Sequence, residues 1–463
     1  MSDSPRALPS RLPPPASAAG IRGEILLLAL PVLGEQLLIY CVGLFDTFLA
    51  GRISTEATSA IGIAAYVNWL GSLLFSLVSI GTTALVARHW GARDFLGANR
   101  FFNQSLPLAA AVGVVAGGLI WAIAPTIARL QNMDGETFRI VVRYLRIDAC
   151  GYVFSSLSVV AAAALRGTGD MRSPMILLGF VNILNMIVST TLVFGFGPIS
   201  PWGVDGIVTG TVVARTGGGL LMLAALARGR SGLRINRADL RLRMYEVRRI
   251  LRIGIPGAAD GGLTWFGHFV FLMIIARLAD GELGTAIFAA HVIGIQVEAL
   301  TYLPATAWGT AAATLIGQSL GAQQPDRAWR GGHEAVAQGC LLALCASIAY
   351  YCGAPAIFRL MHTSPQVHQI GVPALRFLAL FQVPLAVGII YVQALRGAGD
   401  TRYPMLFSLC GVLLVRVPLA YLCGIVLHGG LLGAWIGMCA DVSLRGLLAA
   451  LRFTRGKWQR LQV

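Results

Sequence analysis

The chain has 463 residues, of which 56% are hydrophobic and only 12% are charged. These charges are too few to cover the surface of a soluble protein of this size, so the composition excludes an ordinary soluble globular protein and indicates an integral membrane protein. The formal net charge is +15, and almost all basic residues are arginines that flank apolar segments. Such arginines meet anionic lipid headgroups, so we expect no nucleic-acid partner.

Twelve apolar segments follow one another along the chain. A helix needs about 20 apolar residues to cross the hydrocarbon core of a bilayer, and each segment is long enough. We therefore predict an all-α integral membrane fold with twelve transmembrane helices. The first six lie at 24–50, 57–87, 101–130, 141–165, 173–196 and 203–227, and the second six at 247–279, 284–317, 334–360, 373–395, 403–427 and 430–453.

The two sets of six helices follow one plan. The segment 165–175 reads LRGTGDMRSPM, and 395–405 reads LRGAGDTRYPM, 230 residues later. A repeat at half the chain length indicates duplication. Because six is even, both copies enter the membrane in the same orientation, as parallel repeats related by a pseudo-two-fold axis along the membrane normal. Alternating access is the usual transport mechanism of such repeats.

The distribution of arginines predicts the orientation. Nine arginines lie between 228 and 252, and most of the others flank helix ends on the same side. The positive-inside rule places this side and both termini in the cytoplasm, so we expect a multi-pass protein, monomeric, of the plasma (inner) membrane. The predicted parts are a disordered cytoplasmic tail at 1–20, an N-lobe at 21–228, a cytoplasmic linker at 229–246, and a C-lobe with a cytoplasmic tail at 247–463.

Ionisable side chains inside the spans carry the functional information, because a charged group in hydrocarbon costs about 3 kcal/mol or more unless it faces a partner or a cavity. The first span contains Glu35 and Asp46, eleven residues apart. This spacing places both on one helical face, about 16 Å apart. Asp260 holds the position of Glu35 in the second copy, each four residues after a proline, whereas Phe271 occupies the position that matches Asp46.

The eighth span carries a second polar stripe. His291, Glu298 and Tyr302 are spaced by seven and four residues, which places them on one helical face. Two interpretations are open for intramembrane groups of this kind: they bind substrate or a second ion, or they pair structurally with a buried arginine, asparagine or backbone group. The substrate or second-site candidates are Glu35, Asp260, His291, Glu298 and Tyr302.

Other charged residues receive a structural interpretation. Asp441 and Arg445 are four residues apart and predict an ion pair. Arg416, inside the eleventh span, must also be paired or solvated in a cavity. Asp170 and Asp400 lie in the repeated glycine-rich turns, where we expect them to shape the turn and cap the next helix, with gating as the alternative role.

Several motifs resemble those of one transporter family. FDT at 45–47, AH at 290–291, GQSLGA at 317–322 and the twice-used LRGxGD turn are similar to the multidrug and toxic compound extrusion (MATE) family, over about residues 21–458. The resemblance implies a transporter rather than an enzyme, with no cofactor. It also implies export of organic, often cationic compounds, driven by the inward flow of protons or sodium ions.

The resemblance further implies an ion-coupling site in the N-lobe. Asp46 matches the first-span aspartate of the family, and Asn185 and Thr211 match polar residues around it. Ser189 stands where many members have a second aspartate. We expect these four residues to form the site and favour protons over sodium at Asp46, because one carboxylate holds a metal cation less well than two. No catalytic residue is expected.

The second lobe departs further from the family pattern. Thr264 and Leu385 occupy positions where one branch of the family has acids in spans seven and ten. An ion site copied from that branch is therefore not expected here, and Asp260 and Glu298 are the nearest substitutes.

Two other functions fit the sequence less well. A lipid-linked oligosaccharide or metabolite flippase of the same superfamily would share the twelve spans but would need a cationic cavity, whereas the mid-span charges singled out are mostly acidic. A membrane enzyme would need a cluster of acids or histidines in a substantial loop, and the longest loop, 228–252, offers mainly arginines. We therefore predict a secondary antiporter that exports organic cations or multiple drugs by alternating access.

Overall fold

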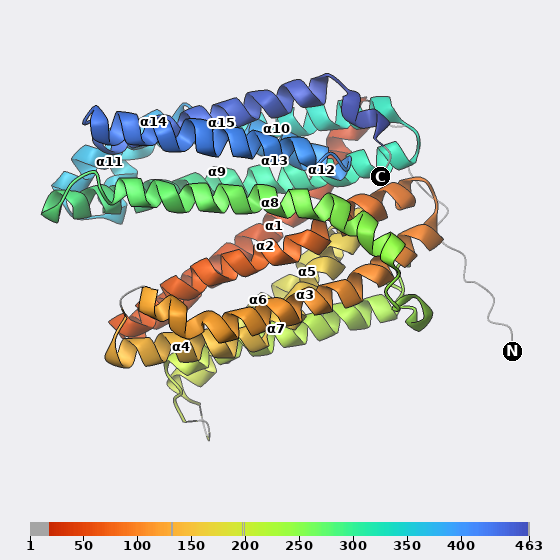
Figure 1. The fold of residues 1–463 in the computed structure, drawn as a ribbon, viewed down its shortest axis with the longest axis horizontal. Helices are drawn as coiled ribbons and strands as arrows, with labels where there is room; N and C mark the ends of the chain where they lie inside the picture. The colour runs from red at the N-terminus through yellow and green to blue at the C-terminus, as the bar shows by residue number, and fades with distance from the viewer. Residues whose placement is uncertain (1–17, 131–132, 197, 199, 462–463) are drawn as a thin grey trace, which may run out of the picture. The chain divides into compact units, whose positions relative to one another are not determined.

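The computed structural model describes residues 18–130, 133–196, 198 and 200–461. These residues divide into two compact units, and the division falls within one long helix. The N-unit extends to Arg252 and includes Gly321–Gln323, and the C-unit comprises Ile253–Leu320 and continues from Gln324. Figure 1 labels the helices of both units.

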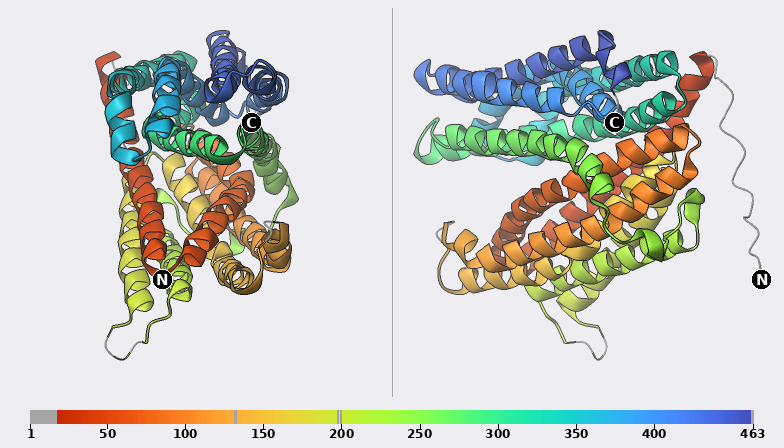
Figure 2. Two further views of the ribbon diagram at one scale, coloured as in Figure 1. Left: turned by 90° about the vertical axis from the view of Figure 1, so that its left-hand side faces the viewer. Right: turned by 45° about the vertical axis from the view of Figure 1, so that its right-hand side comes forward.

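The N-unit consists of helices joined by short connections, and the views in Figure 2 show how they lie beside one another. Helix α6 packs along α7, and α2 packs against both α3 and α5. The helices are α1 (Ala18–Ile53), α2 (Thr55–Gly91), α3 (Phe95–Leu130), α4 (Gly135–Cys150), α5 (Tyr152–Gly167), α6 (Arg172–Phe194) and α7 (Val204–Ala227), followed by the short turns η1 (Arg230–Gly232) and η2 (Arg237–Asp239).

The C-unit repeats this order. Helix α8 begins in the N-unit and continues into the C-unit, and α15 packs against α12 and α14. The elements are α8 (Met244–Ile275), α9 (Gly281–Gly321), α10 (Pro325–Met361), α11 (Pro365–Ala379), α12 (Gln382–Gly397), α13 (Arg402–Leu409), η3 (Cys410–Arg416), α14 (Val417–Tyr421), η4 (Leu422–Val426), α15 (Gly430–Thr454) and η5 (Lys457–Arg460).

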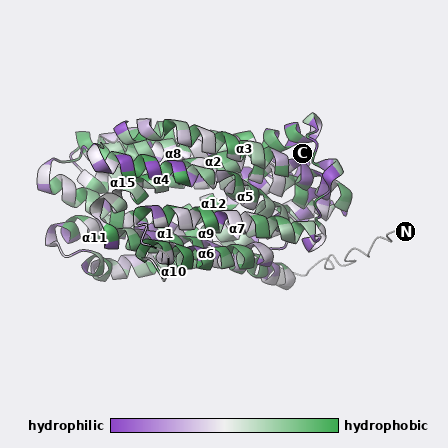
Figure 3. Cartoon of the chain, turned by 90° about the horizontal axis from the view of Figure 1, so that it is seen from below, coloured by the Kyte–Doolittle hydropathy of each residue, from purple (hydrophilic) through white to green (hydrophobic). Residues whose placement is uncertain are grey.

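Length and hydropathy make ten stretches of the described chain able to cross a membrane, and two bent helix pairs raise the number of spans to twelve. The hydropathy colouring in Figure 3 shows apolar residues along the helices and polar residues gathered toward helix ends. The predicted spans 141–165 and 373–395 are the two bent pairs: α4 meets α5 at 48°, and α11 meets α12 at 53°. The prediction of uninterrupted spans there was wrong, because hydropathy does not register a change in helix direction.

The ends of the chain also differ from the prediction. Helix α1 begins at Ala18, so the last three residues of the predicted disordered tail are helical, and residues 1–17 lie outside the described part. The spans predicted to begin at 334 and 373 start at Pro325 and Pro365. In each case proline occupies the first helical turn, where its missing N–H costs nothing, and a polar first turn precedes the apolar segment.

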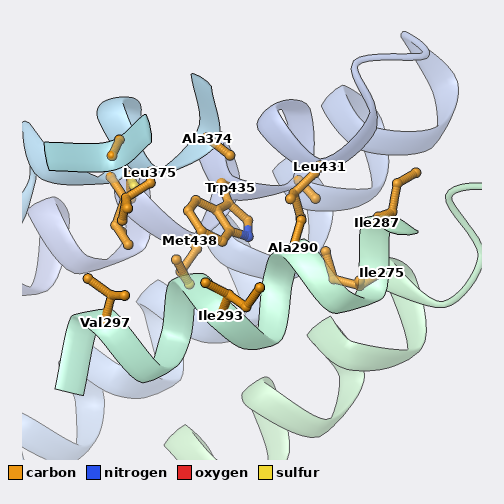
Figure 4. Close-up of a cluster of buried hydrophobic side chains, with 14 of the residues drawn as sticks. Ile275, Ile287, Ala290, Ile293, Val297, Ala374, Leu375, Leu431, Trp435 and Met438 are labelled. Atoms are coloured by element: carbon orange, nitrogen blue, oxygen red, sulfur yellow. The ribbon is translucent and has the colours of Figure 1, made fainter. Parts of the chain in front are cut away.

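The core of the C-unit is built around Trp435 on α15 (Figure 4). Its side chain is fully buried and lies among apolar residues of α9, α11 and α15, including Ile293, Leu375 and Met438. A Cβ atom at Gly294 would lie 2.2 Å from the Trp435 ring. Glycine at 294 therefore lets α9 approach the indole closely, as small residues do between membrane helices.

The eleventh span contains two π-helical segments, η3 and η4, between short α-helices. Isolated π turns widen a helix locally and occur often at functional sites. Here η3 ends at Arg416 and begins next to Gly411, where a Cβ atom would lie 2.1 Å from Oδ1 of Asp441. The widened turn and the glycine together bring this span against a buried carboxylate of α15.

Candidate functional site

The arginine of each repeated turn forms an ion pair with an acid in the first helix of its own unit. Arg166, at the end of α5, pairs with Glu35 of α1. Arg396, at the end of α12, lies 2.5 Å from Asp260 of α8, which also accepts a hydrogen bond from Ser408. Both acids are buried. Two of the five substrate candidates are therefore neutralised by a fixed guanidinium.

These pairs correct the expected location of the two arginines. The sequence placed Arg166 and Arg396 among the arginines that meet lipid headgroups. Each side chain is instead only 18% exposed, because it turns inward to an acid in the same unit. The acid and the arginine lie more than 130 residues apart in the chain, so no local pattern predicts either pair.

The aspartates of the repeated turns have structural partners, as predicted. Asp170 accepts hydrogen bonds from the backbone N–H of Ser173 at 2.9 Å and from its hydroxyl at 2.5 Å. Burial alone would raise the pKa of Asp170, but these bonds and one from Ser231 outweigh it and hold the pKa below its usual value. Asp170 therefore stays ionised and caps α6.

Asp400 uses a different partner in the second copy of the turn. Arg452 of α15 donates to its Oδ2 from Nε at 2.8 Å, and Nη2 lies at the same distance. Burial raises the pKa of Asp400 despite this pairing and despite a backbone hydrogen bond from Tyr403. The two turns therefore share a backbone design, while each is attached to a different segment of its own unit.

A buried ion pair lies at the centre of the N-unit. Nη1 of Arg215, on α7, donates to Oδ1 of Asp148, on α4, at 2.8 Å, and Asp148 is 1% exposed. Nη2 of Arg215 lies 3.4 Å from Oδ1 of Asn68, which also accepts from the hydroxyl of Tyr152 at 3.1 Å. The guanidinium is thereby held between α2, α4 and α7.

Asp46 lies near this ion pair but has no partner of its own. Its carboxylate is within electrostatic range of Arg215 and Asp148. Oδ1 of Asp46 is buried, and nothing in the described part of the chain forms a hydrogen bond or ion pair with this side chain. Asp46 is therefore the one acid of the three in this region that no fixed cation neutralises directly.

The other predicted coupling residues lie at the packed interface of α6 and α7. Nδ2 of Asn185 donates to Oγ1 of Thr211 at 3.1 Å, and the Ser189 hydroxyl lies 3.4 Å from the carbonyl oxygen of Ile207. A Cβ atom at Gly210 would lie 2.8 Å from the Ser189 backbone, so the helices meet here closely. The structure brings Asn185, Ser189 and Thr211 together, one turn from Arg215, without a hydrogen bond from any of them to Asp46.

The C-unit contains a larger charged cluster. Asp441 of α15 is fully buried between two arginines: Nε of Arg416 lies 2.8 Å from Oδ2, and Nε of Arg445 lies 2.8 Å from Oδ1. Arg445 also approaches the hydroxyls of Ser408 and Thr264, at 3.4 Å each. The predicted pairing of Asp441 with Arg445, and of Arg416 with some partner, is confirmed.

The three residues of the predicted α9 stripe have different surroundings. His291 is 1% exposed in the apolar core, and its Nδ1 accepts from the Trp435 indole at 3.2 Å. Tyr302 is half exposed. Glu298, between them, is partly buried within electrostatic range of Arg416, and no ion pair or hydrogen bond from the described residues reaches it. His291 and Tyr302 do not join Glu298 in one binding site.

Sequence reasoning missed the ion pair of the N-unit. Asp148 lies within the predicted span 141–165, and Arg215 within 203–227, so the rule that singled out Asp46 also applied to both. The arginines that enter the spans also revise the view that mid-span charge is mostly acidic. Five arginines have partners inside the two units: Arg166, Arg215, Arg396, Arg416 and Arg445.

Comparison with known proteins identifies the family. The family model MatE matches residues 31–191 and 263–422, one stretch in each half of the chain. A probable multidrug resistance protein NorM of Thermotoga maritima is 31% identical over 96% of this chain and 94% of its own length. Multidrug resistance protein PmpM of Pseudomonas aeruginosa is 26% identical over 93% of this chain and 91% of its own length.

Solved structures share the fold. A MOP superfamily transporter from Pyrococcus furiosus has a TM-score of 0.87 at 21% identity, over 96% of this chain and 97% of that one. A MATE crystal structure described as the straight conformation has a TM-score of 0.86 at 21% identity, over 94% and 97%. The chain therefore belongs to the multidrug and toxic compound extrusion (MATE) family of membrane transporters.

Proposed function

We propose that this protein is a secondary antiporter that exports organic cations, multiple drugs among them, in exchange for protons by alternating access. Asp46 is its coupling acid in the N-unit. The observation that carries the proposal is that Asp46 alone, among the three acids of the N-unit interior, lacks an arginine partner. The names of the bacterial relatives, which refer to multidrug resistance, support the class of cargo.

The charges of the N-unit favour a cationic cargo. Its interior holds the acids Glu35, Asp46 and Asp148 and the arginines Arg166 and Arg215. With all five ionised, the cluster has one excess negative charge. A bound organic cation would balance that charge, and a proton on Asp46 would cancel it. Cation and proton therefore compete for the same charge, which is the basis of antiport.

The same charges favour protons over sodium. A sodium ion beside Asp46 would have the permanently protonated guanidinium of Arg215 within electrostatic range. Only one carboxylate would be available, since Asp148 already binds Arg215 and Ser189 is neutral. The free amide oxygen of Asn185 and the Thr211 hydroxyl are weaker donors for a hard cation. A proton needs one unpaired carboxylate and no coordination shell.

Two experiments test the proposal. Cells that express the chain are compared with cells that lack it, using a panel of cationic, neutral and anionic dyes and drugs, and we expect lower accumulation of several cationic compounds. Proteoliposomes then receive an imposed proton gradient or an imposed sodium gradient, and only the proton gradient is expected to drive uptake of the cationic dye ethidium. Sodium-dependent, proton-independent uptake would replace the coupling ion.

An anionic or lipid-linked cargo is the competing function. The reported title for the Pyrococcus furiosus relative states that reverse polarity of its binding pocket suggests a different function. In this chain all five inward-facing arginines are already bound by acids, which disfavours an anionic cargo. Transport restricted to the anionic members of the panel would support the competing function. Both termini are proposed to be cytoplasmic in the plasma membrane, and the transporter is proposed to act as a monomer.

The Asp148 pair gives a further prediction. In an Asp148→Asn variant, Arg215 loses its carboxylate, and Asp46 is the remaining one within electrostatic range. We expect Arg215 to hold Asp46 ionised and proton-driven ethidium transport to fall at least about ten-fold, since about 1.4 kcal/mol changes a protonated fraction ten-fold. Asp148→Glu, which keeps the charge, is the matched control. Full transport by Asp148→Asn would contradict the role assigned to this pair.

A further inference from the structure

The repeat offset relates the charged centres of the two units. Arg445 lies 230 residues after Arg215, and Glu298 lies 230 residues after Asn68. In the N-unit, Asn68 and Arg215 are hydrogen-bonded, and Arg215 binds Asp148. In the C-unit, Arg445 likewise binds a buried aspartate. Both units therefore place an arginine and an aspartate at the same point of the repeat.

The acid without a partner comes from a different helix in each unit. The N-unit has Asp46 on α1, and the matching residue of the C-unit is the fully buried Phe271. The C-unit has Glu298 on α9, and the matching residue of the N-unit is the neutral Asn68. Each unit thus retains one unpaired acid close to an arginine–aspartate pair, although no single position in the repeat carries it in both.

The charges of the C-unit cluster also differ when Glu298 changes state. Asp441 binds Arg416 and Arg445, so these three groups have one excess positive charge. Asp260 and Arg396 balance each other. An ionised Glu298 near Arg416 balances the excess, and a protonated Glu298 leaves it. The cluster therefore alternates between neutral and positive.

The groups around Glu298 have fixed partners. On α10, the hydroxyl of Tyr350 lies 3.0 Å from Oγ1 of Thr301 and donates to the carbonyl oxygen of Val297 at 2.9 Å. These bonds bracket Glu298 on its own helix. The other titratable or charged groups that face it are Tyr302 on α9, Arg416 on η3, and Cys439 on α15. Nothing in this set binds the carboxylate in place, so Glu298 is able to exchange a proton without breaking a hydrogen bond.

We propose that Glu298 is a second proton-binding site, in the C-unit, that acts in parallel with Asp46. The proposal rests on the function proposed above. A proton from water forms an O–H bond with the Glu298 carboxylate, and the cluster of Arg416, Asp441 and Arg445 then has an excess positive charge. That charge repels an organic cation, and loss of the proton to water removes it. Proton binding at Glu298 and cation binding are therefore antagonistic.

Infrared difference spectroscopy tests the site without requiring transport. The reconstituted wild-type protein is titrated from about pH 5 to about pH 9, a range that spans the ordinary and shifted values of carboxyl groups, and the carbonyl band of protonated carboxylic acids is followed. Labelling of glutamate with carbon-13 shifts bands from glutamic acid but not from aspartic acid. We expect a labelled, titrating band that Glu298→Gln abolishes and Glu298→Asp restores as an unlabelled aspartic acid band.

A matched control distinguishes Glu298 from other glutamates. Glu282 is exposed at the start of the same helix, so Glu282→Gln makes the same chemical change outside the cluster and is expected to leave the band unchanged. A wild-type protein without a labelled titrating band would overturn the proposal, even if Glu298→Gln fails to fold. A band that persists in folded Glu298→Gln would overturn it equally.

The number of protons released on cation binding supplies the functional test. Ethidium is added to weakly buffered, detergent-purified protein, and a pH indicator measures protons released per ethidium bound. We expect Glu298→Gln to bind ethidium with about half the release of wild type, because Asp46 remains, and Asp46→Asn to show the complementary loss. Undiminished release by Glu298→Gln would refute a second coupled site. If the wild type binds no ethidium at all while the infrared band is present, the proposed cargo fails and the proton site stands.

Discussion

The Asp46→Asn variant is expected to lose proton-coupled export of ethidium, with transport falling to the level of empty vesicles. Asparagine has nearly the shape of aspartate but cannot gain or lose a proton at physiological pH. Asp46 forms no ion pair or hydrogen bond with the other described residues, so its replacement breaks no structural contact. Melting temperature and yield of the purified variant should therefore match wild type, in contrast to its transport.

Two controls make this result specific. Asp46→Glu keeps a carboxyl group and should retain measurable proton-driven transport. Asp280→Asn makes the same chemical change at an exposed residue between α8 and α9 and should transport normally. Normal drug efflux by Asp46→Asn, at wild-type expression, would remove Asp46 from the mechanism.

Replacement of Asp441 is expected to have the largest effect on stability. This carboxylate is fully buried and is bound by both Arg416 and Arg445. Asp441→Asn would leave two guanidinium groups without their counter-charge inside the C-unit. Removing one partner of a buried ion pair costs about 3–5 kcal/mol. Thermal unfolding of the purified variant, followed by circular dichroism, should show a clear loss of stability.

The exposed pair of Asp205 with Arg143 provides the comparison for Asp441. Its atoms are 2.7 Å apart, but the two side chains are 26% and 69% exposed. Pairs of this kind contribute about 0–1 kcal/mol, so Asp205→Asn should unfold close to the wild-type temperature. Equal losses from Asp441→Asn and Asp205→Asn would mean that the Asp441 cluster is not a stabilising centre.

The sequence predicted the fold well because hydropathy and the repeat report on it directly. The span ends at 130 and 227, for example, agree with α3 and α7. The bend between α4 and α5 was not predictable in this way, because both helices are part of one continuous apolar or weakly amphipathic segment. Helix direction depends on packing against other helices, which a single-segment pattern does not describe.

The candidate site was predictable residue by residue but not as a set of pairs. A charge inside an apolar span was sufficient to single out Asp46, Glu35 and Asp260. Which of them are neutralised depends on distant arginines, and only the structure shows that Glu35 and Asp260 are paired while Asp46 is not. The distinction between a structural acid and a candidate coupling acid is thus a property of the fold.

The ion pairs of the repeated turns also bear on how the protein is made. Glu35 precedes its partner Arg166 by 131 residues, and Asp260 precedes Arg396 by 136. At about 5–20 residues per second, the ribosome needs on the order of 10 s to deliver each arginine after its acid. Until then, the first helix of each unit carries an acid with no counter-charge, which disfavours its entry into lipid by about 2.5–3.5 kcal/mol. Each half of the chain can therefore settle in the membrane only when its fifth span has been synthesised.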